Sequence, residues 1–253
     1  MTDLHAYTDE FFEYIERGSI ASASRIAQFL VPLLKVNSVL DVGCGRGAWL
    51  NEWRKAGVGT AQGIDGPYVQ RSSLLIPAQD FTSVDLTRPF DSKHRYDLVT
   101  CLEVAEHLPP SAAEPLVSSL VKHSDRILFS AATPGQGGEN HLNERPLSYW
   151  QRLFAAHDYI AFDAVRPSFQ HDPQIEPWYK FNTVLYVRSA AVSSLPKSVI
   201  ETEVGNTGLR DAGDFMWNVR RGILRFLPHQ VVTRLARWNS NRVNTARRSR
   251  SRQ

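Results

Sequence analysis

The sequence predicts an α/β fold, in which a three-layer, doubly wound, mostly parallel sheet carries helices on both faces. Three observations support this prediction. Short apolar runs alternate with amphipathic helical patterns from residue 38 to about residue 131. Glycines follow the first apolar run, and two later runs end in aspartate. Two consecutive strand-like runs then close the pattern between residues 159 and 188.

Local patterns along the chain predict the individual strands and helices. The run at 38–42 stops at glycines and is typical of a buried strand. The helix at 46–56 would place Trp49 and Trp53 on one face, and the helix at 146–157 would begin at Pro146. A helix from residue 111 would start with a capping box, Ser111 to Glu114. The other expected elements are a helix at 8–34 with a break at Gly18-Ser19, and strands at 59–64, 80–84, 96–102, 126–131, 159–165 and 178–188.

Length and composition restrict the class of protein. A chain of 253 residues with 42% hydrophobic and 22% charged residues is neither disordered throughout nor fibrous. No apolar run approaches the roughly 20 residues of a membrane span, and the first residues do not resemble a secretory signal. Cys44 and Cys101 are the two cysteines, which favours a reducing compartment. We therefore expect a cytoplasmic protein.

The charge is unevenly distributed. Residues 217–253 contain ten arginines and no lysine, aspartate or glutamate. Because the whole chain carries +3 and this segment +10, residues 1–216 carry −7. The sequence therefore predicts a folded domain at 1–190, followed at 191–253 by a linker and a basic, partly helical tail.

Apolar and basic side chains alternate within that tail. Pro228 would split it into two helices. Such a basic amphipathic segment could lie on an anionic membrane, pack back on the domain with the last dozen residues disordered, or bind a partner. The apolar face would comprise Leu224, Leu227, Val231, Leu235 and Trp238, interleaved with Arg220, Arg221, Arg225, Arg234 and Arg237.

A glycine-rich loop follows the first expected strand. Its glycines are Gly43, Gly45 and Gly47, and they permit close approach of a ligand at a helix N-terminus. The spacing G-x-G-x-G differs from the G-x-G-x-x-G of dinucleotide sites. Asp41, just before the loop, would repel a pyrophosphate but suits a cationic amine or hydroxyl donors. The alternative is a tight turn without a ligand.

Two further acids stand at comparable positions. Asp65 ends the second expected strand and could accept hydrogen bonds from ribose hydroxyls. Asp85 follows the third, where it could reach an adenine amino group. Either aspartate alone could be a turn residue. Together with the glycine loop, they suit a nucleoside ligand.

These segments resemble the class I S-adenosylmethionine-dependent methyltransferases over residues 20–190. The resemblance implies a seven-stranded sheet whose last strand is antiparallel, and S-adenosyl-L-methionine as cofactor. The cofactor-binding residues that it implies are Asp41, Gly43, Gly45, Asp65, Asp85, Leu86 and Leu102. The stretches 134–143, 149–150 and 175–182 are similar to bacterial methyltransferases that act on glycans and sugars.

The pattern E-x-x-E-H follows the fourth expected strand. It resembles the metal site of ubiquinone-biosynthesis O-methyltransferases and of small-RNA 2′-O-methyltransferases. The resemblance implies a divalent cation such as Mg on Glu103, Glu106, His107 and His141. Without a metal, His107 or His141 would be the general base. A wholly structural role for both histidines stays open.

The sequence thus predicts transfer of a methyl group to a hydroxyl of a small molecule or glycan, a sugar in the favoured case. Such an enzyme would act in polysaccharide biosynthesis, in the cytoplasm or on the inner face of the membrane. The alternatives are an RNA ribose methyltransferase and a catalytically silent cofactor-binding module. The acidic body argues against nucleic acid, because it offers no basic groove.

Overall fold

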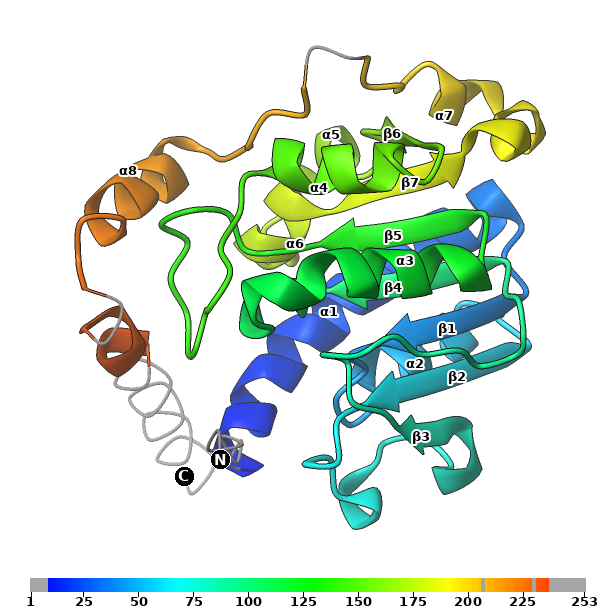
Figure 1. Ribbon diagram of the computed structural model, residues 1–253, viewed down its shortest axis with the longest axis horizontal. Helices are drawn as coiled ribbons and strands as arrows, with labels where there is room; N and C mark the ends of the chain where they lie inside the picture. The colour runs from blue at the N-terminus through cyan, green and yellow to red at the C-terminus, as the bar shows by residue number, and fades with distance from the viewer. Residues whose placement is uncertain (1–8, 206–207, 229–230, 237–253) are drawn as a thin grey trace.

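The computed structural model describes residues 9–205, 208–228 and 231–236, and only the backbone of residues 9–17. Among these residues, seven strands form one sheet in the order β3-β2-β1-β4-β5-β7-β6 (Figure 1). β7 is antiparallel to both of its neighbours, and the remaining pairs are parallel. The strands are β1 Ser38–Val42, β2 Thr60–Asp65, β3 Phe81–Ser83, β4 Leu98–Leu102, β5 Arg126–Ser130, β6 Tyr159–Phe162 and β7 Val184–Arg188. The predicted doubly wound sheet is confirmed.

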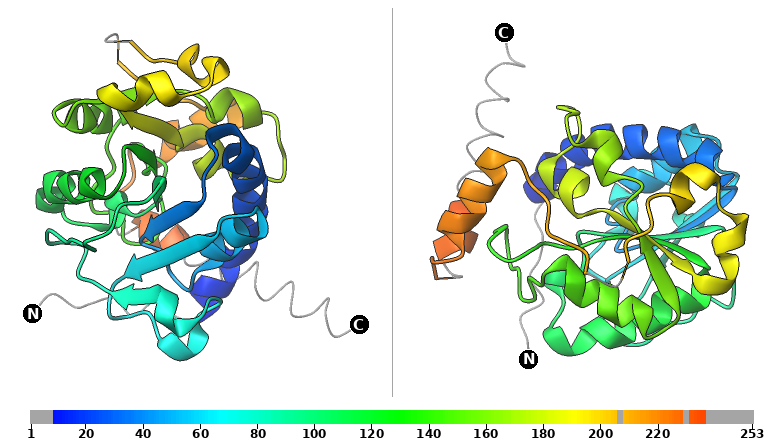
Figure 2. Two further views of the ribbon diagram at one scale, coloured as in Figure 1. Left: turned by 90° about the vertical axis from the view of Figure 1, so that its right-hand side faces the viewer. Right: turned by 90° about the horizontal axis from the view of Figure 1, so that it is seen from above.

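Helices cover both faces of this sheet, so the fold has three layers (Figure 2). One core lies beneath α1 and α2 and contains Trp49 and Trp53. The other lies beneath α3 and α4 and contains Trp150. The helices are α1 Asp9–Leu34, α2 Ala48–Lys55, α3 Ala113–His123, α4 Leu147–Ala155, α5 Arg166–Phe169, α6 Pro177–Asn182, α7 Lys197–Ile200 and α8 Phe215–Leu224. Short 3-10 turns are η1 Arg71–Ser73, η2 Ala78–Asp80, η3 Ala105–His107, η4 Pro110–Ala112 and η5 Ser189–Ser194.

The break predicted at Gly18-Ser19 is wrong, because α1 is continuous through these residues. A tertiary contact explains why glycine occupies position 18 of this helix. A Cβ at this position would lie 2.3 Å from the Glu176 carboxylate. The Ser22 hydroxyl donates to Gly18 O and accepts from the Glu176 amide. The glycine therefore permits close packing against the segment that precedes α6.

Two local predictions also fail. Residues 178–182 form the helix α6 instead of the start of a strand, because Pro177 occupies the first helical turn after the extended residue Glu176. The capping box at Ser111 does not form. A 3-10 turn occupies 110–112, and α3 begins only at Ala113 without a side-chain cap.

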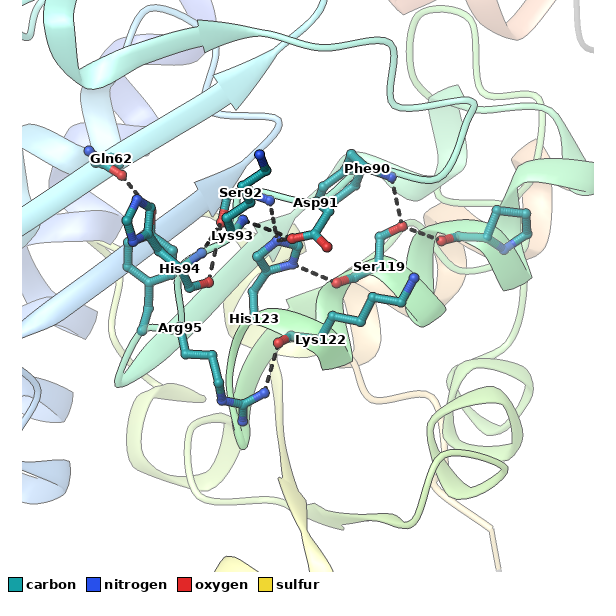
Figure 3. A network of polar contacts seen from close by, with 12 residues as sticks. Gln62, Phe90, Asp91, Ser92, Lys93, His94, Arg95, Ser119, Lys122 and His123 are labelled. Carbon is teal, nitrogen blue, oxygen red and sulfur yellow. Dashed lines mark hydrogen bonds and ion pairs between the residues drawn. The ribbon is translucent and has the colours of Figure 1, made fainter.

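A buried polar network holds the loop before β4 against the end of α3 (Figure 3). His123 is buried, and its Nδ1 lies 2.7 Å from Ser119 O. Its Nε2 accepts from the amide of Ser92 at 2.8 Å. Because a carbonyl only accepts, Nδ1 must carry the proton. The Phe90 ring stacks on the imidazole at 5.5 Å. This histidine therefore has a structural role.

The chain continues to pack against the body after β7. Leu195 and Val199 join one core, and Leu209 joins the other, so the packed body extends beyond residue 190. Trp217 of α8 is buried, with its ring 5.9 Å from that of Phe181. Pro228 separates α8 from helical residues 231–236, as predicted. The rest of the predicted amphipathic stretch, from residue 237, and the last dozen residues lie outside the described part of the chain.

None of the helices in the described ranges is both long enough and apolar enough to span a membrane.

Candidate functional site

The residues singled out from the sequence gather at one edge of the sheet. β1, β2, β4 and β5 run parallel, so their carboxyl ends meet there (Figure 1). Asp41 and Asp65 lie within the last two residues of β1 and β2, and Leu102 ends β4. α8 lies on the side toward which these strands point (Figure 1).

The glycine loop between β1 and α2 adopts a conformation that suits glycine. Gly43, Gly45 and Gly47 all have positive φ, at 80°, 54° and 91°. A Cβ on Gly43 would lie 2.3 Å from Val104, and one on Gly47 would lie 2.9 Å from Ile76. The loop therefore touches the segment after β4, which carries Glu103, Glu106 and His107.

Asp41 is a buried carboxyl beside this loop. The Thr100 hydroxyl donates to its Oδ1 at 2.6 Å. Burial raises the pKa of Asp41 to about 7, although the hydrogen bond from Thr100 opposes the shift. A cation placed beside Asp41 would favour its ionised form, which agrees with the expectation of a cationic ligand group.

Asp65 is buried as well, and it is tied to the glycine loop. Its Oδ2 accepts from the amide of Gly45, and its Oδ1 from the amide of Gly66, each at 2.6 Å. The Tyr68 hydroxyl donates to Oδ1. Burial raises the pKa of Asp65 despite these bonds. Oδ2 has one protein donor among the described residues, and a carboxylate oxygen can accept two, so it can take a ligand hydroxyl.

Asp85 follows β3 but is exposed. It accepts hydrogen bonds from the hydroxyl and the amide of Thr87, at 2.6 and 3.0 Å. These bonds lower the pKa of Asp85. The carboxylate therefore stabilises its own turn. The side chains of Leu86 and Leu102, the two apolar residues predicted to contact the cofactor, are both buried.

Glu106, His107 and His141 form the most compact group of ionisable side chains in the site. One ligand atom of each lies within 4.8 Å of the others. The two imidazole rings are edge to face, with centroids 4.9 Å apart. Burial, and then the proximity of His141, lower the pKa of His107 to about 3, so this imidazole is neutral. Burial and the nearby Glu103 raise the pKa of Glu106 well above its usual range.

Glu144 fixes the orientation of His141. His141 Nδ1 lies 2.8 Å from Glu144 Oε1. The same carboxylate accepts from the amides of Gly135 and Gly137, at 2.8 and 2.9 Å. Burial opposes ionisation, but the bonds from His141 and the two amides lower the pKa of Glu144. An ionised carboxylate only accepts, so Nδ1 donates to Glu144, and Nε2 is the ring nitrogen that does not contact this carboxylate.

Glu103 lies outside the three-residue group, although the sequence placed it among the ligands. Its carboxylate accepts from Gln136 Nε2 at 2.7 Å and from Asn182 Nδ2 at 3.3 Å. Asn182 Nδ2 also donates to Gln136 Oε1 at 2.7 Å. The backbone of Glu103 has a φ of 55°, unusual for a residue other than glycine. The side chain of Glu103 is thus tied to two amides.

Several site residues were missed in the sequence. Thr100 is a polar residue within a wholly buried strand, and it pairs in register with Asp41, which was a usable signal. Glu144 stands three residues after His141, also a usable signal. Gln136 and Tyr68 gave no such signal, because their partners are distant in sequence or depend on how a turn folds.

Comparison with known proteins identifies the family of the chain. Residues 12–171 match a family model described as a methyltransferase domain. The chain is 29% identical over 157 residues to a ubiquinone biosynthesis O-methyltransferase of Neisseria meningitidis, and the match spans 58% of each chain. It is 30% identical over 176 residues to the enzyme of that name from Hydrogenovibrio crunogenus, covering 64% of this chain and 68% of the relative.

Solved structures share the fold. A sugar N-methyltransferase from a Streptoalloteichus species aligns with a TM-score of 0.56 at 15% identity, covering 74% of this chain and 95% of that one. A magnesium protoporphyrin IX methyltransferase from Synechocystis, with bound SAH, aligns with a TM-score of 0.52 at 18% identity, covering 73% and 90%. The chain belongs to the methyltransferase domain family, and its fold is that of the class I S-adenosylmethionine-dependent methyltransferases.

Proposed function

We propose that this protein transfers a methyl group from S-adenosyl-L-methionine to a hydroxyl oxygen of its acceptor. The observation that carries the proposal is the contact between the glycine loop and the segment after β4. Gly43 lies against Val104, so the expected cofactor loop adjoins the segment that bears Glu106 and His107. Cofactor and acceptor would therefore meet at the carboxyl edge of the sheet.

In the proposed reaction, a lone pair of the acceptor oxygen attacks the methyl carbon in line with the carbon–sulfur bond. That bond breaks, its electron pair returns to sulfur, and the products are an ether and S-adenosylhomocysteine. The hydroxyl proton must pass to a base. The protein therefore supplies alignment of the two substrates and removal of one proton.

For the cofactor, we assign the methionine end to Asp41, Gly43 and Gly45, and the ribose to Asp65. Asp85 and Leu86 would border the adenine, and Leu102 would pack beside the bound cofactor. The burial of Asp41 and the positive φ of the glycines support this assignment. The lone pair left on Asp65 Oδ2 suits a ribose hydroxyl.

We assign proton removal to His141, assisted by the neutral His107. Glu144 supports this role, because it holds His141 through Nδ1, so that Nε2 would be the nitrogen that takes the proton, and it would stabilise the imidazolium that forms. The group Glu106, His107 and His141 could also hold a divalent cation, although its two imidazoles and one carboxylate fit a transition-metal ion better than Mg. Glu106 Oε2 is buried without a partner among the described residues, and His107 is neutral. When bound, such an ion would lower the pKa of the acceptor hydroxyl.

We propose a sugar, as part of a glycan, for the acceptor. The network of Glu103, Gln136 and Asn182 supports this, since buried amides and carboxylates recognise hydroxyl-rich ligands. Asn182 Oδ1 is buried without a partner among the described residues, so it can accept from an acceptor hydroxyl. Polysaccharide biosynthesis would be the corresponding process.

The test is calorimetric titration of the full chain with S-adenosylhomocysteine. We expect binding, and we expect Asp65→Ala to weaken it by about 1–3 kcal/mol through loss of hydrogen bonds to a charged group. Asp163→Ala is a suitable control, because Asp163 pairs with Arg166 after β6, away from the glycine loop. Binding of a nicotinamide dinucleotide without binding of S-adenosylhomocysteine would contradict the proposal.

We further propose that the C-terminal segment contacts an anionic membrane peripherally. Phe215, Met216, Ile223 and Phe226 are 78, 71, 60 and 82% exposed. They belong to, or adjoin, the segment with ten arginines and no acid. Apolar side chains among arginines suit a bilayer interface, where each arginine contributes about 1 kcal/mol at most.

Cosedimentation with vesicles of phosphatidylcholine, with and without phosphatidylglycerol, tests this contact. We expect the full chain to sediment with the anionic vesicles, and the double variant Ile223→Ser, Phe226→Ser to sediment less. Leu75→Ser is the matched control, because Leu75 is an exposed leucine near η1, outside this segment. Equal sedimentation of all three proteins would contradict membrane contact.

A further inference from the structure

A cavity lies between the loop that carries His141 and the C-terminal helices. Its volume is about 360 Å³. His141 and Glu144 line it from one side, and Leu224, Leu227 and Val232 from the other. The cavity therefore combines the candidate base with an apolar wall from residues beyond 190.

The backbone of this loop lies close to both C-terminal helices. A Cβ on Gly137 would lie 2.9 Å from both Leu224 and Val232. A Cβ on Gly135 would lie 2.4 Å from the carbonyl oxygen of Arg221. Both glycines have positive φ. The apolar wall is thus packed directly on the loop that binds the Glu144 carboxylate.

Polar contacts anchor α8 in the same position. The Arg221 guanidinium forms an ion pair with Asp211 at 2.7 Å and donates to Pro134 O at 3.3 Å. The Asp214 carboxylate caps α8 by accepting from the amide of Trp217. Figure 2 shows α8 beside the loop between β5 and α4. The wall is therefore a fixed part of the site.

The charges of the cavity differ between its two sides. The Glu144 carboxylate is occupied by His141 and two backbone amides. Arg225 also lines the cavity, and it belongs to a segment that contains no acidic residue. The cavity thus presents an imidazole and an aliphatic wall, and Arg225 borders it with a guanidinium that lies 5.6 Å from the neighbouring Phe226 ring.

We propose that this cavity binds the methyl acceptor, and that it selects a molecule whose hydroxyl is carried on an apolar body beside an anionic group. The hydroxyl would face His141, the apolar body Leu224, Leu227 and Val232, and the anion Arg225. This assignment rests on the proposed methyl transfer and not on the network of Glu103, Gln136 and Asn182, which does not line the cavity. Two sources share the required chemistry: a sugar acid with an alkyl substituent, and an aromatic diol with a carboxylate.

The experiment titrates the full chain, saturated with S-adenosylhomocysteine, with hexyl glucuronide and with caffeate. Leu224→Trp and Val232→Trp, one from each helix, would fill the cavity. We expect each to weaken binding of at least one probe about tenfold or more, because the ring occupies the volume that the ligand needs. Ile223→Trp is the matched control, because Ile223 precedes Leu224 but is 60% exposed. We expect it to bind like wild type.

A charge variant tests the second part of the proposal, which is that Arg225 recognises an anionic group. We expect Arg225→Gln to weaken binding of the probe about tenfold, the equivalent of one charge-assisted hydrogen bond. Hexyl glucoside, the uncharged analogue, should bind this variant and wild type equally. Arg234→Gln is the control, because Arg234 is an exposed arginine of the same basic segment that does not line the cavity.

The outcomes are distinct. Binding of only one probe identifies the body of the acceptor as sugar or aromatic. Equal affinity in wild type, Leu224→Trp and Val232→Trp overturns the acceptor assignment, as does failure of both probes to bind a wild type that binds S-adenosylhomocysteine. If one tryptophan variant loses S-adenosylhomocysteine binding, it is misfolded and the other decides. Failure of wild type to bind S-adenosylhomocysteine overturns the methyltransferase proposal itself, and the acceptor assignment with it.

Discussion

Glu144 holds His141 through a 2.8 Å contact between Oε1 and Nδ1, and the opposite edge of the same ring lies against Gly138. A Cβ on Gly138 would stand 2.2 Å from His141 Nε2, the atom that we assign to proton removal. The imidazole is thus confined from both edges. Its position depends on a carboxylate three residues later and on a glycine three residues earlier.

Gly138→Ala should therefore impair catalysis with little effect on the cofactor. We expect kcat to fall on the order of 100-fold, because the methyl group displaces the base from its working position. The measurement is initial rates together with titration by S-adenosylhomocysteine, whose affinity should stay unchanged. Gly222→Ala is the control, because a Cβ there meets nothing within 4 Å. Equal rates for the two variants would contradict the assignment of His141.

Binding of S-adenosylhomocysteine should depend on pH through Asp41. Burial raises the pKa of Asp41 from 3.8 to about 7, so in the free protein the carboxyl is protonated below about pH 7. Only the carboxylate can pair with the ligand ammonium. Affinity should therefore fall about tenfold for each pH unit below 7 and level off above it. Calorimetry at several pH values checks this.

The control is Asp41→Asn, which should bind S-adenosylhomocysteine more weakly at high pH and lose this pH dependence. A wild-type affinity that is constant between pH 5 and 7 would argue against the role of Asp41.

Metal content should depend on Glu106 and not on Glu103. Glu106 belongs to the compact group with His107 and His141, whereas Glu103 is bonded to Gln136 and Asn182. After incubation with Mg or Mn and desalting, we expect Glu106→Gln to lose the ion and Glu103→Gln to retain it. Elemental analysis of the full-length proteins is the measurement. If wild type stripped of metal by a chelator still transfers methyl groups at the full rate, the reaction needs no metal, and His141 remains as the general base.

His123→Ala should destabilise the fold. The substitution leaves the Ser92 amide without its acceptor and removes the ring that stacks on Phe90. We expect a loss of about 2–4 kcal/mol in the free energy of unfolding. Urea denaturation at a fixed pH measures it. His94→Ala, at an exposed histidine of the same loop, should change stability by less than about 0.5 kcal/mol. Similar midpoints for the two variants would show that the network contributes little.

The alternation of strands and helices, the glycine loop, and the placing of Asp41 and Asp65 at strand ends could all be predicted from the sequence. These features depend on local periodicity and on neighbours in the chain, and parallel strands necessarily bring their carboxyl ends to one edge. The E-x-x-E-H stretch was visible for the same reason. His141 was included through a resemblance, and the structure places it against His107.

Which side chains act together depends on the tertiary structure. It tied Glu103 to Gln136 and Asn182, while leaving it near enough to raise the pKa of Glu106, the second glutamate of the same stretch. It made residues 178–182 helical and gave Gly18 a packing role. It also placed the C-terminal helices against the His141 loop. Each outcome depends on contacts between residues far apart in sequence, and such contacts are set by packing and burial, which local spacing does not encode.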